Sequence, residues 1–498
     1  MNYIGISAGF HDAAISVIDD HGNILFAGHS ERYNKEKHTK HLCNDIVSDA
    51  LKYSTSRDLE IHYYERPFMK YLRQLRSGEK PSLSNISTKK IIGDGLLHKL
   101  TDGKGGKVRT HNHHLSHAAS GFQTSPYDDA TVVVIDAIGE FDTISIYNAW
   151  YDKNGVAQYK KLWGKKYPDS IGLFYSAMTQ RVGLRPLDEE YILMGMAAYG
   201  NSKPLKQMSN ELVESYKDII FKDNLHTGVP ADFLEGVDDM SIATSAQLIV
   251  EQLITNVISK ARMLGGSKNL VYGGGVALNC LANRLLGEFY DNIWIIPNPG
   301  DAGSSLGASA LGYGKQLNWT DAYLGHNIPG DYPVNKLLDH LVTTGIVGVA
   351  SGRAEFGPRA LGHRSLLADP RGSEIKDKVN EIKRRQKFRP FAPIILEEYA
   401  DTYFDMPKGF SNSRYMQVIS RCKVPELFPA IVHHDNTSRV QTVPKDGSGI
   451  RELLEKWYVL TGCPMLLNTS LNVRGEPMVN GRLDADRFEK LYNVPVIS

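Results

Sequence analysis

The fold is decided by the stretch Tyr3-Ile-Gly-Ile-Ser-Ala-Gly-Phe-His-Asp-Ala-Ala-Ile-Ser-Val-Ile18, near the amino terminus. Its apolar and β-branched runs, broken by glycine and aspartate, predict two strands joined by a turn. A second turn and a third strand follow. The predicted order is strand, turn, strand, turn and strand, over residues 3–7, 9–12, 13–18, 19–22 and 23–28.

A similar design recurs after residue 130. There a strand over residues 132–136 leads through a turn over residues 137–142 into a strand over residues 143–149. Two such units, each followed by helical sequence, predict an α/β domain made by duplication, of the ribonuclease-H or actin type. Ligands of such a domain sit between its halves, so we expect both turns to face a cleft.

Four residues near these elements suit a metal ion. His113 and His117 are four positions apart, which places both imidazoles on one face of a helix. Asp136 closes the apolar run of residues 131–135, and Asp301 lies in a glycine-rich turn before a helical pattern. Two histidines and two aspartates suit Fe(II), Zn or Mn, and the residue types alone do not choose among these ions.

A glycine run marks a candidate phosphate site. Helical patterns dominate residues 170–264, and a strand over residues 269–272 then runs into Gly273-Gly-Gly275 and helical sequence over residues 276–286. A strand-glycine-helix junction exposes backbone N–H groups at the positive end of a helix, where they can cradle phosphate. The same run also fits a tight turn with close helix packing.

A second domain begins near residue 344 and is rich in arginine and lysine. Its strands are expected over residues 347–350, 415–419 and 464–467. Residues 352–390 contain eleven Lys and Arg against five Asp and Glu. Interleaved glycine, proline and phenylalanine favour an anion pocket over a solvated charged face, because Arg presents a planar fork to phosphate or carboxylate. Arg439 and Asn468-Thr-Ser470 can add donors, so the segment predicts a site for a small phosphorylated acid.

The bulk properties exclude several classes of protein. A net charge of +1 excludes a globally basic nucleic-acid binder, and four scattered cysteines argue against a disulfide framework or a cysteine zinc site. We expect a cytoplasmic protein, because no segment has the roughly 20 apolar residues of a membrane span and no export signal is visible. Residues 66–109 hold eleven Lys and Arg against three acidic residues, which permits nucleic-acid contact without favouring it.

Eight motifs follow one another in a specific order. They are Phe10-His-Asp-Ala-Ala14, Glu31-Arg32, His113-His-Leu-Ser-His-Ala118, Gly274-Gly-Val-Ala-Leu-Asn279, Gly300-Asp-Ala-Gly-Ser304, Phe356-Gly-Pro-Arg-Ala-Leu-Gly362, Phe388-Arg-Pro-Phe-Ala-Pro393 and Leu467-Asn-Thr-Ser470. In this order the chain resembles the O-carbamoyltransferases of antibiotic and nodulation-factor biosynthesis. The resemblance implies an actin-like (ASKHA, duplicated ribonuclease-H-like) transfer domain over residues 1–343, similar to threonylcarbamoyl-transfer proteins, and a YrdC-like α/β activation domain over residues 344–498.

The resemblance also implies a chemistry. ATP with Mg(II) would activate carbamoyl phosphate to carbamoyl-adenylate, because a carbamate is a poor electrophile and adenylation supplies a leaving group. A hydroxyl acceptor would then take the carbamoyl group in the metal-bearing domain. We expect this acceptor to be a small natural product, a sugar, or a nucleoside or hydroxymethylated base.

Roles are implied residue by residue. The metal ligands, for Fe(II) or another divalent ion, would be His113, His117, Asp136 and Asp301. The nucleotide site would comprise Gly139, Gly195, Gly273, Gly274, Gly275 and Asn279. Carbamoyl phosphate would be held by Arg359, Arg364, Lys383, Arg389, Arg439, Asn468 and Ser470, with Lys383 and Arg389 also catalytic. His11 is the expected acceptor-side general base, since an imidazole can take a hydroxyl proton.

Two alternatives stay open. One is transfer of a threonylcarbamoyl group to tRNA, against which stand the near-neutral charge and the presence of both expected domains in one chain. The other is an actin-fold kinase or a non-catalytic metal-binding protein, and neither of these explains the Arg/Lys pocket beside Asn468-Thr-Ser470. A symmetric homodimer is the default expectation for an enzyme of this size.

Overall fold

Mixed sheets and helices build both parts of the chain in the computed structural model, which describes residues 1–103, 107–447 and 449–498. Unit 1 contains residues 1–30 and 38–320, and unit 2 contains residues 31–37 and 321–498. The predicted α/β class is thereby confirmed. Within the described ranges, no helix has the length and apolar character that crossing a bilayer requires.

The two large sheets of unit 1 have the same strand order. Sheet 1 runs β3 (Ile24–His29), β2 (Ala14–Asp19), β1 (Asn2–Ser7), β4 (Leu59–Tyr63) and β5 (Val108–Thr110). Sheet 2 runs β8 (Ala157–Lys166), β7 (Asp142–Tyr151), β6 (Asp129–Gly139), β11 (Asn269–Gly273) and β12 (Asn292–Trp294). In each sheet the first three strands of the sequence are antiparallel and the last two add in parallel. The predicted duplication is therefore present in the strand order.

The second strand-turn-strand unit differs from its prediction in one respect. β6 continues to Gly139, through the beginning of the turn expected at residues 137–142. The pairing register with β7 shifts between Ile135 and Gly139, and Glu140 has a positive φ of 59°. A bulge thus keeps the chain extended past Asp136, and only Glu140 and Phe141 separate the two strands.

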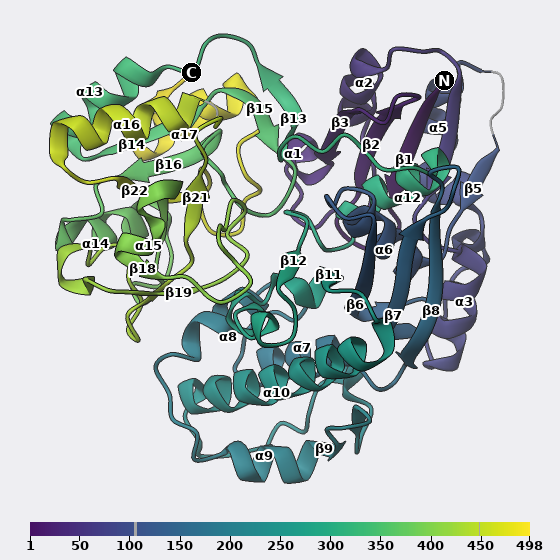
Figure 1. The fold of residues 1–498 in the computed structure, drawn as a ribbon. Coiled ribbons are helices and arrows are strands. Elements are labelled where there is room, and N and C mark those ends of the chain that lie inside the picture. The colour runs from purple at the N-terminus through teal and green to yellow at the C-terminus, as the bar shows by residue number, and fades with distance from the viewer. Residues whose placement is uncertain (104–106, 448) are drawn as a thin grey trace. The chain divides into compact units, whose positions relative to one another are not determined.

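Two helices lie between the sheets of unit 1 (Figure 1). α12 (Gly303–Tyr313) packs on β1, β2 and β4, α6 (His113–Phe122) packs on β6 and β11, and the two helices contact each other. Small residues allow this close approach. A Cβ atom on Gly307 would lie 1.8 Å from the Ser116 carbonyl oxygen, and one on Gly5 would lie 1.8 Å from that of Ser305. The packing therefore brings the first turns of both helices together.

The region from residue 170 to residue 286 is less regular than the sequence indicates. Its helices are α7 (Ile171–Arg181), α8 (Glu190–Met196), α9 (Leu205–Leu212), α10 (Asp239–Gly265) and α11 (Cys280–Asn283). The short strands β9 (Val213–Ser215) and β10 (Ile220–Phe221) interrupt them. The single helix expected over residues 276–286 is wrong, because Asn279 has a ψ of 85° and its side chain caps the following helix at Ala282 N–H.

Further helices lie along the first 110 residues of unit 1. They are α2 (Asn44–Tyr53), α3 (Pro67–Arg76), α4 (Thr88–Ile92) and α5 (Asp94–Leu100). α3 begins with Pro67 at its first turn, where a missing N–H costs nothing. Lys70 and Arg73 on this helix line the pocket described below.

Unit 2 has a six-stranded mixed sheet with helices packed on it. The order is β21 (Gln441–Val443), β17 (Ala392–Leu396), β22 (Met465–Ser470), β16 (Arg364–Ala368), β14 (Ile346–Ala350) and β23 (Val496–Ile497). Its helices are α1 (Glu31–Asn34), α13 (Val334–Thr344), α14 (Ser373–Ile382), α15 (Ala400–Tyr403), α16 (Gly449–Thr461) and α17 (Arg482–Tyr492). Smaller sheets pair β13 (Tyr323–Ile328) with β15 (Gly352–Glu355), and β18 (Phe404–Asp405) with β19 (Ser420–Cys422) and β20 (Thr437–Ser438).

Two of the three strands predicted for unit 2 are confirmed. Residues 347–350 lie in β14, and residues 465–467 of the third predicted segment lie in β22. The strand expected over residues 415–419 is wrong. Met416 has a positive φ of 57°, and its buried side chain joins a small apolar cluster with Leu361 instead of alternating along a strand.

Candidate functional site

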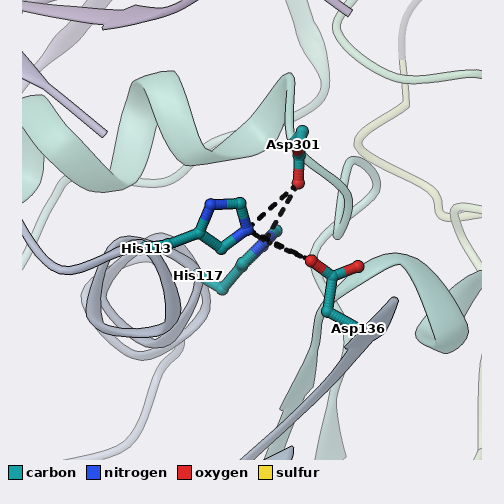
Figure 2. Close-up of side chains that lie close together, drawn as sticks. All are labelled: His113, His117, Asp136 and Asp301. Carbon is teal, nitrogen blue, oxygen red and sulfur yellow. Dashed lines mark hydrogen bonds and ion pairs between the residues drawn. The ribbon is translucent and has the colours of Figure 1, made fainter. Parts of the chain in front are cut away.

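A cluster of two histidines and two aspartates lies at the centre of unit 1. His113 and His117 come from the first turns of α6, Asp136 from the bulged end of β6, and Asp301 from the turn that precedes α12 (Figure 2). All four side chains are buried. Three elements that are far apart in the sequence thus converge on one point.

The distances within the cluster are those of atoms that face one centre. His113 Nε2 lies 3.1 Å from Asp136 Oδ2 and 3.3 Å from Asp301 Oδ1. His117 Nε2 lies 3.3 Å from the same Asp301 oxygen and 3.1 Å from His113 Nε2. One atom from each residue, four in all, lies within 4.8 Å of the other three.

The tautomer of His117 is fixed by the backbone. His117 Nδ1 lies 3.0 Å from the carbonyl oxygen of Pro299, which can only accept a hydrogen bond. Nδ1 therefore carries the proton, and in the neutral ring Nε2 keeps its lone pair directed at the cluster. Such a bond to the second ring nitrogen is the usual way in which proteins orient a metal-binding histidine.

Glu65 has the corresponding position behind His113. Its carboxylate lies 3.6 Å from His113 Nδ1, and among the described residues this nitrogen has no closer hydrogen-bond partner. Lys70 donates to Glu65 at 2.7 Å, so a buried carboxylate and a cation stand behind the His113 ring, on the side away from the cluster. The sequence analysis gave neither residue a role. Glu65 lies outside every motif quoted above, and Lys70 is one of the eleven Lys and Arg of residues 66–109, so neither residue type indicates a site.

The charges in the cluster depend on one another. Burial disfavours ionisation of Asp136, but hydrogen bonds from His113 and His117 lower the pKa of Asp136 well below its usual value. Burial likewise disfavours a charged His113, but Asp301 and Asp136 raise the pKa of His113 well above its usual value. Without a bound cation, protons on the imidazoles therefore compensate the two carboxylates.

This donor set fits a divalent cation. Two imidazole nitrogens and two carboxylate oxygens, buried and turned toward one centre, are ligands that Fe(II), Zn and Mn accept. A bound ion would replace the protons that now separate these atoms, so loading would release protons. The residues present a cluster able to hold a metal ion, and their types do not select which one.

A pocket of about 190 Å³ opens onto three of the four cluster residues, His113, Asp136 and Asp301. Two strand-to-strand turns of unit 1 line it, through Phe10 and His11 between β1 and β2 and through Asp136, Ala137, Ile138 and Glu140 at the end of β6. Leu173 and Ala177 of α7, with Pro186 and Leu187 of the loop after it, add apolar wall, and Glu65, Lys70, Arg73 and Glu79 add charged wall. The duplicated fold thus places its two turns against one cavity, beside the buried cluster.

His11 stands at the boundary between this pocket and the cluster. Its Nε2 lies 3.8 Å from Asp301 Oδ2, and its Nδ1 lies 2.8 Å from Asp12 Oδ2. Burial opposes the charge on His11, but Asp12 and Asp301 together raise the pKa of His11 to about 9. In the absence of a cation, His11 is therefore protonated at neutral pH and cannot accept a proton.

The glycine run adjoins the cluster. Gly275 N–H donates to Asp136 Oδ1 at 3.2 Å, so this donor already serves a carboxylate. Gly274 has a φ of 87°, and a Cβ atom there would lie 2.2 Å from the Ile135 carbonyl oxygen, which explains the glycine. Gly273 ends β11. The structure therefore brings the predicted phosphate loop and the predicted metal ligands together.

The other predicted nucleotide residues are more dispersed. Asn279 is buried, exchanges hydrogen bonds with Gln247 and caps α11, so its amide is occupied within the protein. Gly139 lies against His113, because a Cβ atom there would be 2.4 Å from the imidazole. Gly195 lies in α8, where the preceding residue, Met194, contacts Cys280 of α11.

In unit 2 the structure gathers several predicted residues around the end of β22. The Lys383 ammonium group donates to both the carbonyl and hydroxyl oxygens of Ser470, and to two oxygens of Asn472 at 2.8 and 3.0 Å. Asn468 is buried and donates to the Ala360 carbonyl at 3.0 Å. Lys383, Asn468 and Ser470 therefore share one region.

The predicted arginines of unit 2 differ in how fully the fold uses them. Arg364 is buried in β16 and donates to the carbonyl oxygens of Ser351, Gly352, His326, His363 and Asn480. These contacts occupy its guanidinium within unit 2, so the fold itself uses this charge. Arg439 has a buried Nε with no hydrogen-bond partner among the described residues. Arg359 and Arg389 are half-buried on loops.

Two family models match this chain. Residues 2–310 match the carbamoyltransferase N-terminus, and residues 338–496 match the carbamoyltransferase C-terminus. The first match alone covers more than half of the sequence. It includes every residue of the buried cluster, and the second includes Lys383, Asn468 and Ser470.

Curated relatives align over almost the whole chain. An uncharacterized protein of Synechocystis sp. is 31% identical, over 97% of this chain and 93% of that protein. Nodulation protein NolNO of Sinorhizobium fredii is 29% identical over 95% and 76%, and nodulation protein U of the same species is 29% identical over 93% and 92%. Component A of the Acidaminococcus fermentans (R)-2-hydroxyglutaryl-CoA dehydratase has a TM-score of 0.34 at 14% identity, covering 63% of this chain and 98% of that one. A similarity at that level adds nothing to the assignment.

Proposed function

The chain belongs to the carbamoyltransferase family, and on that premise we propose that it is an ATP-dependent O-carbamoyltransferase. Unit 2 activates carbamoyl phosphate, and unit 1 transfers the carbamoyl group to a hydroxyl of a small natural product, a sugar, or a nucleoside or hydroxymethylated base. The observation that carries the proposal is the pocket in unit 1, which His11 and three cluster residues line together.

Activation is assigned to the polar region around β22. Carbamoyl phosphate, ATP and one water would give carbamoyl-adenylate, pyrophosphate and inorganic phosphate. Lys383, Ser470 and Asn468 would hold the carbamoyl phosphate with Arg359, Arg389 and Arg439, since arginine matches phosphate oxygens bidentately. The partnerless Nε of Arg439 supports this, because a buried donor without an acceptor is costly unless a ligand supplies one.

Transfer is assigned to the pocket of unit 1. The acceptor oxygen would attack the carbamoyl carbon while its proton passes to His11 Nε2, and AMP would leave with the electron pair of the broken C–O bond. The glycine loop, with Gly139 and Gly195, would hold the nucleotide beside the cluster. Asn279 would support the loop through its cap on α11.

Charge compensation in the cluster bears on the role of His11. Fe(II) or another divalent ion at the cluster would act as a Lewis acid toward a bound oxygen atom. Neutralising Asp301 and Asp136 would also remove two of the attractions that raise the pKa of His11. His11 would then accept a proton closer to neutral pH, as a general base must.

The fold assignments of the two units follow the same premise. The repeated strand order of unit 1 supports an actin-like class. The mixed sheet of unit 2 is assigned to the YrdC-like class on the motif resemblance alone. Mg(II) would accompany ATP, and a homodimer is the default assembly.

The deciding experiment is to follow phosphate, pyrophosphate and AMP with purified protein, ATP, carbamoyl phosphate, and Fe(II) or Mg(II), omitting each component in turn. We expect pyrophosphate release that requires carbamoyl phosphate, and AMP release that rises with a hydroxyl acceptor. ADP formation would instead identify a kinase. Turnover requiring threonine and tRNA would identify threonylcarbamoyl transfer, and no turnover with any metal or acceptor class would favour a binding protein.

Two substitutions test the division of labour between the units. Lys383→Ala should reduce pyrophosphate release by at least about 10²-fold, because it removes a buried cation at the proposed phosphate site. His11→Ala should leave pyrophosphate release intact and slow carbamoylation of the acceptor by about 10²- to 10⁴-fold. The reverse pattern would contradict the assignment of activation to unit 2 and of transfer to unit 1.

A further inference from the structure

Behind His11, a chain of polar side chains runs away from the pocket. His11 Nδ1 lies 2.8 Å from Asp12 Oδ2, and His38 Nδ1 lies 2.7 Å from Asp12 Oδ1. His38 Nε2 lies 2.9 Å from Asp188 Oδ1, and the Arg185 guanidinium lies 2.7 Å from Asp188 Oδ2. All five residues belong to unit 1, and of the five only His11 lines the pocket.

The geometry of the chain determines which atoms carry protons. Ionised carboxylate oxygens can only accept, so His11 Nδ1 and His38 Nδ1 both donate to Asp12. His38 Nε2 donates to Asp188 for the same reason. His38 therefore carries two N–H groups between two carboxylates, and Asp188 is in turn held by Arg185. Charges of opposite sign alternate along the chain behind His11.

Asp12 is the link whose orientation matters most. Each of its oxygens serves a different imidazole, so the carboxylate cannot rotate without losing the bond to His11 or the bond to His38. With Nδ1 of His11 fixed as a donor, its Nε2 is directed toward Asp301 and the cluster. His38 therefore restrains His11 through Asp12, at a distance from the pocket.

The backbone supports the same arrangement. Asp12 and His38 have φ values of 52° and 56°, a left-handed backbone conformation that residues other than glycine adopt uncommonly. The two segments are tied together, since Ala13 N–H donates to the Thr39 carbonyl at 2.8 Å. Unfavourable backbone conformations at two residues that face each other are typical of functional sites, where the surroundings hold the strain.

We propose that His38, anchored by Asp188, is a positioning residue for carbamoyl transfer. It acts on His11 through Asp12 and touches neither acceptor nor carbamoyl donor. The inference rests on the proposed function, because it takes His11 as the base that receives the acceptor proton. When that proton reaches Nε2, Asp12 stabilises the resulting imidazolium through Nδ1, and His38 keeps Asp12 in place for this.

The test compares His38→Ala and Asp188→Asn with a matched control, His41→Ala. His41 lies on the same segment and is exposed; its carbonyl oxygen accepts from the Ser30 hydroxyl, and its N–H donates to the Thr39 hydroxyl. For His38→Ala we expect the kcat of acceptor carbamoylation to fall by about 10²-fold, because misorientation of a catalytic group is costly. The KM for the acceptor should change less than about threefold, since the pocket wall is intact. Asp188→Asn should give a smaller loss in the same direction.

A structural role alone would give a different result. Pyrophosphate release by unit 2 and the melting temperature should match the His41→Ala control in both variants. Unchanged kcat in His38→Ala would overturn the proposal, and so would equal losses in both half-reactions together with a lower melting temperature.

A crystal structure of His38→Ala separates this inference from the proposed function. We expect the His11 ring and the Asp12 carboxylate to be rotated or disordered, while the His41→Ala structure keeps the 2.8 Å bond. An unmoved His11–Asp12 pair would overturn the positioning role even if the wild-type protein carbamoylates nothing. Failure of the wild-type protein to transfer would overturn the proposed function without affecting this structural result.

Discussion

The buried cluster of unit 1 and the basic segment of unit 2 both collect charged side chains, but the fold treats them in opposite ways. In unit 1, nitrogen and oxygen atoms with lone pairs face one another, and only protons or a cation can compensate them. In unit 2, Arg364 meets a ring of carbonyl oxygens supplied by the chain itself, whereas Arg439 has a buried Nε without a partner among the described residues. Residue type therefore does not identify a ligand site, because the fold satisfies some charged groups and leaves others open.

The largest expected effect is at the cluster. Asp301→Ala should abolish stoichiometric metal loading and slow acceptor carbamoylation by at least about 10³-fold, because removing a ligand takes away several kcal/mol of stabilisation. Metal content by mass spectrometry and product formation by chromatography would measure the two effects. The exposed Asp223→Ala is the matched control. Full metal loading in Asp301→Ala would show that Asp301 is not a required ligand, and would contradict the contrast between the cluster of unit 1 and the basic segment of unit 2.

The second prediction concerns the arginines of unit 2. Arg364→Ala should lower the free energy of unfolding by about 3 kcal/mol or more, since it leaves five buried carbonyl contacts without a donor. Arg359→Ala should leave stability within about 0.5 kcal/mol and raise the KM for carbamoyl phosphate about tenfold. Urea denaturation and initial rates of pyrophosphate release would distinguish the two variants. If Arg364→Ala changed only the KM for carbamoyl phosphate, the carbonyl contacts of Arg364 would not stabilise the fold, which would contradict this prediction.

The smallest expected effect contrasts histidines within unit 1. Burial, then Arg109, lowers the pKa of His62 to about 4, and burial, then His62, lowers the pKa of His111 to about 4, whereas the cluster raises the pKa of His113. A histidine with a lowered pKa stays neutral in the fold while the unfolded chain takes up protons. Its contribution is complete above about pH 6.5 and is lost as pH falls toward about 4.

In chelator-treated protein, each of these two histidines should therefore lower the free energy of unfolding by about 1–2 kcal/mol between pH 7 and pH 5, while His113, with its raised pKa, contributes in the opposite direction. His111→Gln should reduce that loss, and the exposed His98→Gln should not. Denaturation curves at both pH values would measure the difference. An unaltered pH dependence in His111→Gln would show that the buried pair His62 and His111 is not its source.

Local sequence pattern was sufficient to predict the first strands and the four residues of the cluster. The apolar and β-branched runs of residues 3–28 predicted β1, β2 and β3, because turn residues bound each run. The spacing of His113 and His117 depends only on helix geometry, and both lie on one face of α6 as expected. Asp136 and Asp301 were recognisable as acidic residues at element ends.

Other features depended on contacts that no local pattern encodes. Glu65 reaches His113 because α6 is held against the segment after β4, where Ser116 donates to the Tyr64 carbonyl oxygen. Asn279 breaks a helical pattern because its side chain caps the next turn. Arg364 and Arg359 stand in the same basic segment, residues 352–390, yet one is buried among carbonyl groups and the other is half-buried on a loop.

By itself, the sequence determined the α/β class, the duplicated strand-turn-strand units, the family and the four residues of the cluster. Short-range geometry and eight ordered motifs contain that information. Only the tertiary structure decided which charges are already neutralised, that Gly275 serves Asp136, and that His38 stands behind His11 through Asp12. Hydrogen bonds between segments distant in the sequence decide these points, since only the folded chain brings a buried polar group to its partners.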